Sequence, residues 1–179
     1  MPAPSFDPLH PSTRVRTPTP GRQALGLAGW LLLCFGAAAV GGVASASAAS
    51  FYGMLQRPDW APPAWLFGPV WSLLYLLMAV SAWLVWRRLG WAAAGGALAL
   101  FVLQLAVNAS WSWFFFAWRL GLASIVVQVA LLALAGATAA AFWPRSRLAA
   151  VLLLPYLGWL CFALALATAV WRLNPAQFG

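Results

Sequence analysis

The sequence has very few charged residues, and their scarcity excludes most kinds of catalytic site. Only 7% of the 179 residues are charged, there is no lysine, and the only acids are Asp7 and Asp59. The single histidine, His10, lies with Asp7 in a proline-rich N-terminal segment. The body of the chain therefore lacks the groups for paired-carboxylate catalysis, a Schiff base or a metal cage. A Ser-His-Asp triad would require the N-terminal segment to fold back. We expect no metal site, and the absence of acids from the apolar runs argues against a proton-driven transporter.

The composition is too apolar for a soluble domain. The sequence is 64% hydrophobic with a mean hydropathy of +0.86, whereas soluble domains are roughly 45–50% apolar. A net charge of +8 can indicate nucleic-acid binding, but these arginines stand singly or in pairs between apolar runs, as in the loops of membrane proteins. We expect an integral membrane protein with no nucleic-acid partner. Cys34 and Cys161 lie inside apolar runs, and we interpret both as core residues rather than a disulfide or redox pair.

The apolar residues fall into five runs that are each long enough to cross a bilayer, which takes about 20 helical residues. The runs are continuous and rich in alanine and leucine, so they predict helices rather than strands. The first run also resembles a secretory signal peptide, but its apolar stretch is longer than usual and we interpret it as a retained helix. The predicted fold is all-α, an integral membrane bundle of five transmembrane helices. We expect a disordered Pro/Arg-rich tail at 1–22 and a membrane domain at 23–175, with helices at about 24–50, 66–86, 91–118, 120–143 and 148–172.

The arginines predict the orientation of the bundle, because basic residues concentrate in cytoplasmic loops. With the N-terminus in the cytoplasm, three arginines, Arg57, Arg119 and Arg172, fall on the outer side. The other seven fall on the inner side: Arg14, Arg16, Arg22, Arg87, Arg88, Arg145 and Arg147. We therefore expect a multi-pass protein of a bacterial cell membrane with a cytoplasmic N-terminus.

Polar residues within the apolar runs are the first candidates for function. Gln104 and Asn108 are four residues apart and share one helix face, which Trp111 and Phe115 extend. Amides are costly in hydrocarbon unless they are paired. These two therefore either bond neighbouring helices or anchor a ligand in an apolar pocket.

Two further helical stripes are aromatic. Residues 67, 71, 75 and 78 form one stripe (Phe, Trp, Tyr, Met), and residues 155, 159, 162 and 166 form the other (Pro, Trp, Phe, Leu). Each stripe alone is typical of a packed core. Together with the stripe of Trp111 they would line one aromatic cavity suited to flat polycyclic ligands.

Three segments carry a resemblance to a known family. Residues 51–90, FYGMLQRPDWAPPAWLFGPVWSLLYLLMAVSAWLVWRRLG, resemble the first loop and second helix of the TspO/MBR family, the translocator or peripheral-type benzodiazepine receptor proteins. Gln104 to Asn108, followed by Trp111 and Phe115-Phe116, is similar to the family's helix-3 motif. Pro155-Tyr156-Leu157-Gly158-Trp159 and Trp171-Arg172-Leu173-Asn174 are similar to its helix 5. The resemblance covers residues 25–175.

The resemblance implies a five-helix bundle, commonly dimeric, that binds porphyrins, sterol-like lipids and synthetic aromatic ligands. Ala167 stands where many members have asparagine, and Thr168 stands where animal members have the tyrosine of a sterol pattern, so cholesterol is the less expected ligand. Matched residue by residue, the ligand-binding residues would be Trp60, Trp65, Phe67, Trp71, Gln104, Asn108, Trp111 and Trp159. Arg57, the only arginine of the first loop, would meet a porphyrin carboxylate at the interface.

Three functions remain open at this point. The first is a tetrapyrrole-binding sensor, regulator or carrier of the stress-response kind, with the porphyrin as ligand and no cofactor. The second is an enzyme that degrades the bound porphyrin through Trp71 and Trp159, the pair that the resemblance links to such breakdown in some members. The third is a structural membrane adaptor whose aromatic residues only pack. We favour the first, as a homodimer that uses the small-residue face of Ala92, Gly96 and Ala99-Leu100.

Overall fold

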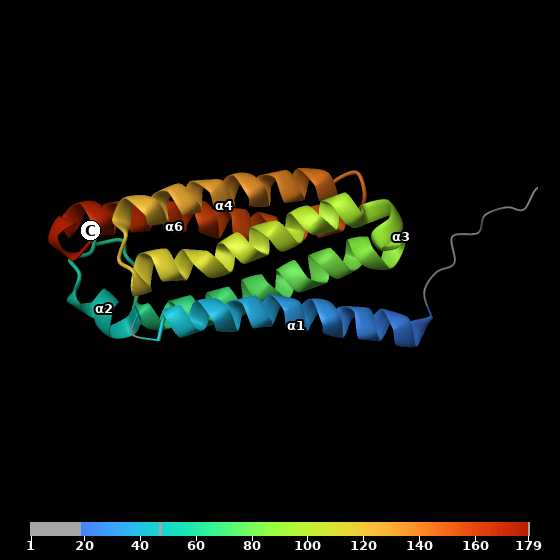
Figure 1. Cartoon of the computed structure of the whole chain (residues 1–179), viewed down its shortest axis with the longest axis horizontal. Helices are drawn as coiled ribbons and strands as arrows, with labels where there is room; N and C mark the ends of the chain where they lie inside the picture. The colour runs from blue at the N-terminus through green and yellow to red at the C-terminus, as the bar shows by residue number, and fades with distance from the viewer. Residues whose placement is uncertain (1–18, 47, 179) are drawn as a thin grey trace, which may run out of the picture.

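The structure is a computed structural model that describes residues 19–46 and 48–178. Over these residues it is mostly helical and contains no strand. Figure 1 shows the long helices running side by side. The predicted all-α membrane bundle is confirmed. The elements are α1 (Pro20–Ala44), α2 (Ala48–Met54), η1 (Ala64–Leu66), α3 (Phe67–Ser112), the π-helical turn η2 (Trp113–Ala117), α4 (Gly121–Phe142), α5 (Arg147–Leu152), α6 (Leu154–Leu173) and η3 (Pro175–Gln177).

The long element α3 consists of two helices that reverse direction at Gly90 (Figure 1). Gly90 has φ 65° and ψ −175°, a backbone conformation that glycine adopts without steric cost and other residues rarely adopt. In the described chain, four helical segments are long and apolar enough to cross a membrane, and the one from Ala64 to Ala117 has 54 residues. That length exceeds twice the roughly 20 residues of one crossing. The two halves of α3 therefore account for the second and third of the five expected spans.

The helix ends differ from the predicted ranges at several places. The expected first helix, 24–50, begins earlier, at Pro20, because proline suits the first helical position. It ends at Ala44, where the Ser45 hydroxyl donates to the Gly41 carbonyl oxygen at 3.0 Å and competes with backbone pairing. The expected last helix, 148–172, is two helices, since Pro155 has no backbone N–H to continue the helix through Leu153. Residues 1–18 of the expected disordered tail lie outside the described part of the chain.

The buried residues form two clusters. The larger cluster packs α1, both halves of α3, α4, α5 and the first part of α6 around fully buried side chains such as Met78, Phe101 and Phe142. The smaller cluster joins α2, η2 and α6, and includes Phe51 and Phe115. Both cysteines are free, as expected.

One of the two cysteines is not a core residue. Cys34 is buried, but Cys161 is exposed on α6, so interpreting Cys161 as a core residue was wrong. An apolar run in a membrane helix has a lipid-facing side as well as a packed side, and the composition of the run does not distinguish them.

Candidate functional site

A cavity with a volume of about 490 Å³ lies among α1, α2, both ends of α3, α4 and α6. Its size falls within the roughly 300–1,000 Å³ that is typical of small-molecule sites. No charged side chain is among the described residues that line it. Nine of the lining residues are aromatic: Phe35, Tyr52, Phe67, Trp71, Tyr75, Trp111, Phe115, Phe116 and Trp159. The cavity therefore suits an apolar, flat ligand body.

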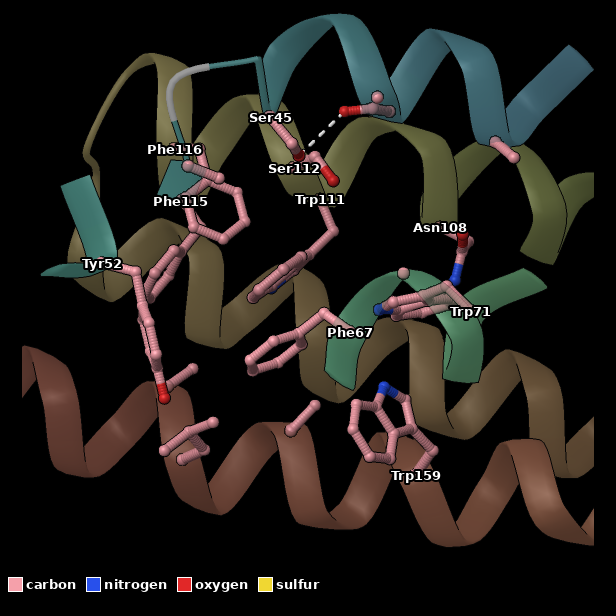
Figure 2. Close-up of a pocket in the computed structure, with 18 of the residues that line it drawn as sticks. Ser45, Tyr52, Phe67, Trp71, Asn108, Trp111, Ser112, Phe115, Phe116 and Trp159 are labelled. Atoms are coloured by element: carbon pink, nitrogen blue, oxygen red, sulfur yellow. Dashed lines mark hydrogen bonds between the residues drawn. The ribbon is translucent and has the colours of Figure 1, made fainter. Parts of the chain in front are cut away.

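Three of these aromatic residues surround one space from two helices. Phe67 and Trp71 are one turn apart at the start of α3, and Trp159 lies on α6 (Figure 2). The rings of Phe67 and Trp159 meet edge to face, with centroids 5.8 Å apart at 75°. The Trp71 ring also contacts those of Tyr75, at 5.6 Å, and Tyr156, at 6.4 Å. These contacts hold the Trp71 ring at the cavity wall.

The indole N–H of Trp159 has no hydrogen-bond partner among the described residues, although the nitrogen is buried. Figure 2 shows this nitrogen on the side of the ring toward Trp71. A buried donor left without an acceptor costs about 1–3 kcal/mol, and such groups are rare in folded proteins. An acceptor atom on a bound molecule would remove that cost once a shift of the ring or its neighbours uncovers the nitrogen.

The amides of Gln104 and Asn108 are occupied by bonds between helices. The Tyr75 phenol donates to Asn108 Oδ1 at 2.6 Å, and Asn108 Nδ2 donates to the Tyr156 phenol oxygen at 3.0 Å. The Tyr156 phenol in turn donates to Gln104 Oε1 at 2.9 Å. Of the two alternatives for this polar pair, the structure contains the interhelical hydrogen bonds. Asn108 still lines the cavity, whereas Gln104 is 1% exposed and lies behind it.

Trp111 also lines the cavity and is fixed by its own contacts. Its indole N–H donates to the Ser124 carbonyl oxygen of α4 at 3.1 Å. Its ring stacks on Phe115, with centroids 5.1 Å apart at 17°. Trp111 thus contributes a ring face to the cavity, while its polar group is already paired.

The three expected site residues between α2 and α3 do not line the cavity. Trp65 is 70% exposed, and Trp60 is 51% exposed with its ring edge against Phe162 at 5.8 Å. The Arg57 guanidinium lies over the Tyr52 ring at 4.8 Å, and Tyr52 is a lining residue. Arg57 is therefore separated from the cavity by one side chain.

Tyr52 connects this loop to the cavity wall. Its phenol donates to the Pro62 carbonyl oxygen at 3.1 Å. Burial raises the pKa of Tyr52 above its usual value of 10.0, although a hydrogen bond from Arg57 and its charge act in the opposite direction. The phenol therefore stays protonated at neutral pH and remains a donor to Pro62.

The outcome for the nine expected binding residues is mixed. Phe67, Trp71, Asn108, Trp111 and Trp159 come together around the cavity. Arg57, Trp60, Trp65 and Gln104 lie beside it or behind it.

The contribution of α1 and α2 was missed from the sequence. The lining residues there include Gly41, Gly42 and Ser45. Gly41 lies so close to the second half of α3 that an added Cβ would be 3.4 Å from Ser112 Oγ. The run of small residues at 37–50 was the available signal, because such runs allow close helix approach. On this side Gly42, Gly68 and Ser72 line the cavity and are also exposed.

Comparison with known proteins gives a consistent result over most of the chain. Residues 30–172 match the TspO/MBR family. The chain is 41% identical to the translocator protein of Homo sapiens over 126 residues, which are 69% of this chain and 75% of that protein. It is 36% identical to Protein CrtK of Rhodobacter capsulatus over 153 residues, 83% of this chain and 92% of that protein. It is also 38% identical to the tryptophan-rich protein TspO of Archaeoglobus fulgidus over 128 residues, 72% of this chain and 82% of that protein.

Proposed function

The chain belongs to the TspO/MBR family, and from this membership and the cavity we propose that it binds a flat hydrophobic ligand of the porphyrin class. The observation that carries the proposal is the unpartnered indole N–H of Trp159 in an uncharged, aromatic cavity. A macrocycle offers broad faces to the indole rings and ring or substituent acceptors to this donor.

The charge distribution supports a particular placement of such a ligand. Carboxylates are costly in an uncharged cavity, so the macrocycle would lie inside with its carboxylates at the rim. Arg57 lies next to the lining residue Tyr52 and is exposed. An exposed guanidinium is the group that pairs with a carboxylate at the membrane interface.

We propose that the protein acts as a sensor, regulator or carrier rather than as an enzyme. Acid–base catalysis needs groups that exchange protons near neutral pH. The described lining residues contain no carboxyl, imidazole or amine side chain. Binding and release of the ligand are therefore the activities that this cavity supports best.

Porphyrin breakdown is the second candidate, and one observation favours it. Trp71 and Trp159 lie across the same space, and Trp71 contacts the two tyrosines, Tyr75 and Tyr156, behind it. Indole and phenol side chains in contact are the oxidisable groups that light- and oxygen-dependent chemistry would use. Dioxygen would be the co-reactant.

A titration of the purified protein with protoporphyrin IX tests the proposal. We expect a saturable change in porphyrin absorbance with about one ligand per chain, since one cavity is proposed. No saturable change would contradict the proposal and favour a structural adaptor. Incubation of the complex in light and air, with product analysis, separates the two candidates: an intact porphyrin supports binding alone, and its breakdown supports the enzyme.

A further inference from the structure

The segment that follows α6 holds the loop beside the cavity. Asn174 ends the helix, and its side chain reaches the backbone of Gln56, 118 residues earlier. Its Oδ1 accepts from the Gln56 N–H at 2.9 Å, and its Nδ2 donates to the Gln56 carbonyl oxygen at 2.8 Å. The same Nδ2 donates to the Val170 carbonyl oxygen at 2.8 Å. Asn174 is 8% exposed, so both ends of its amide are used in a buried contact.

A second contact lies four residues further on. Phe178 is 6% exposed and its ring lies between those of Phe51, at 5.8 Å, and Phe115, at 5.1 Å. Phe115 lines the cavity, and Phe51 precedes the lining residue Tyr52 in α2. The C-terminal segment therefore supports two parts of the cavity wall from behind.

The clamped loop ends at lining residues on both sides. Tyr52 precedes it, Ala64 follows it, and both line the cavity. The bond from Tyr52 to the Pro62 carbonyl oxygen ties the two ends of the loop together. Movement of the loop at Gln56 would therefore displace the wall at Tyr52.

We propose that Asn174 is a positioning residue that controls ligand exchange: its clamp on Gln56 keeps this end of the cavity closed, and its release opens the cavity. The proposal rests on the ligand binding proposed above and adds the residue that governs its rate. Asn174 itself does not line the cavity, so it acts through the loop and α2.

This role has a kinetic signature that a general structural role lacks. If ligand passes only through a minor open state, removing the clamp raises the population of that state. Association and dissociation rates then rise by the same factor, while Kd changes little as long as the closed state predominates. Distortion of the cavity wall would instead weaken binding and raise Kd.

The test measures both rate constants for protoporphyrin IX by stopped-flow fluorescence, for the wild-type protein, Asn174→Ala, Asn174→Asp and Phe178→Ala. Asn174→Asp keeps the shape but loses the donor to Gln56. Gln177→Ala is the matched control, because Gln177 is an exposed residue of the same segment. Hydrogen exchange at the Gln56 amide, measured without ligand, reports the clamp directly.

We expect both rate constants to rise about tenfold in Asn174→Ala, the factor for losing one to two net hydrogen bonds. Kd should stay within about twofold and exchange at Gln56 should accelerate. The control should match wild type. Unchanged rates in a variant with faster Gln56 exchange would overturn the proposal and indicate passage on another side, as at Gly42 and Ser72. Unchanged hydrogen exchange at the Gln56 amide in Asn174→Ala would show that Asn174 does not hold the loop. A higher Kd with unequal changes in the two rate constants would also refute the proposal. A wild-type protein that does not bind the porphyrin would instead refute the proposed function.

Discussion

Asn108 on the second half of α3 donates to the phenol oxygen of Tyr156 on α6, with 3.0 Å between Nδ2 and Oη. Both residues are buried. Because Tyr75 donates to the same asparagine, one amide joins the first and second halves of α3 to α6. The tyrosines of this junction also contact Trp71, so the polar network supports the aromatic wall from behind.

Removal of this amide should destabilise the bundle. In Asn108→Leu, the phenols of Tyr75 and Tyr156 each lose a partner in a buried place, and we expect the free energy of unfolding to fall by about 1–3 kcal/mol. Unfolding in detergent, followed by circular dichroism, measures the change. Ser110→Ala is the control, because the Ser110 hydroxyl bonds only a carbonyl oxygen of its own helix. Equal stability of Asn108→Leu and wild type would show that the network contributes nothing.

Glycine should be required at position 90 because of the positive φ there, and not because a side chain would clash with its neighbours. A Cβ at this position would meet nothing within 4 Å, yet φ is +65°. Gly90→Ala should therefore lower stability by about 1–3 kcal/mol through backbone strain alone. Gly136→Ala is the matched control: its surroundings are equally open but its backbone is helical, so it should be neutral or slightly stabilising. Equal unfolding temperatures of the two variants would contradict the role of the positive φ at Gly90.

The orientation of the bundle is open to a direct test. Arg87 and Arg88 precede the turn at Gly90, and Arg145 and Arg147 flank the start of α5. Both places lie at the end of the bundle where α1 begins (Figure 1). The concentration of arginines predicts that this end is cytoplasmic. Reporter fusions at Leu89 and at the C-terminus should therefore report opposite sides of the membrane, and the same side for both would refute the prediction.

The small-residue face of the second half of α3 should be the seam of a homodimer. Ala92, Gly96 and Ala99 are all exposed there. A Cβ at Gly96 would meet nothing within 4 Å inside the chain, and the position is exposed, so Gly96→Leu should leave the fold intact and shift the detergent-solubilised protein toward monomer. Gly136→Leu, at an equally open position of α4, should not. An unchanged mass in light scattering would exclude this face.

The sequence was sufficient to predict the spans, because their signals are local. Apolar runs of sufficient length, bounded by arginines and by residues such as Gly90 and Pro144, give five crossings in the right order. The separate helix α2 was not predicted, since residues 45–50 have the same small-residue composition as the end of α1. Ser45, which competes for the Gly41 carbonyl, was the only local signal for the break.

Only the parts of the site that lie on one face of a single helix could be predicted from the sequence. Spacing placed Gln104, Asn108 and Trp111 on one face, and the last two do line the cavity. It could not show that the Asn108 amide would be taken by Tyr75 and Tyr156, because those partners are 33 and 48 residues away. For the same reason the clamp between Asn174 and Gln56 has no local signal. Contacts of this kind depend on how the helices pack, which spacing along one helix does not determine.

The most direct test of the binding site is fluorescence quenching by protoporphyrin IX in variants of the two facing tryptophans. Trp71→Phe and Trp159→Phe should each weaken binding by roughly 1–3 kcal/mol, the value of one stacked aromatic residue. That is about 5- to 150-fold in affinity, and the double variant should bind more weakly still. Trp143→Phe is the control, because Trp143 is 52% exposed and does not line the cavity. The account predicts weaker binding in the first three variants and wild-type binding in the control. Single variants that bind within about twofold of wild type while retaining their helical circular dichroism, or equal weakening in all four, would contradict it.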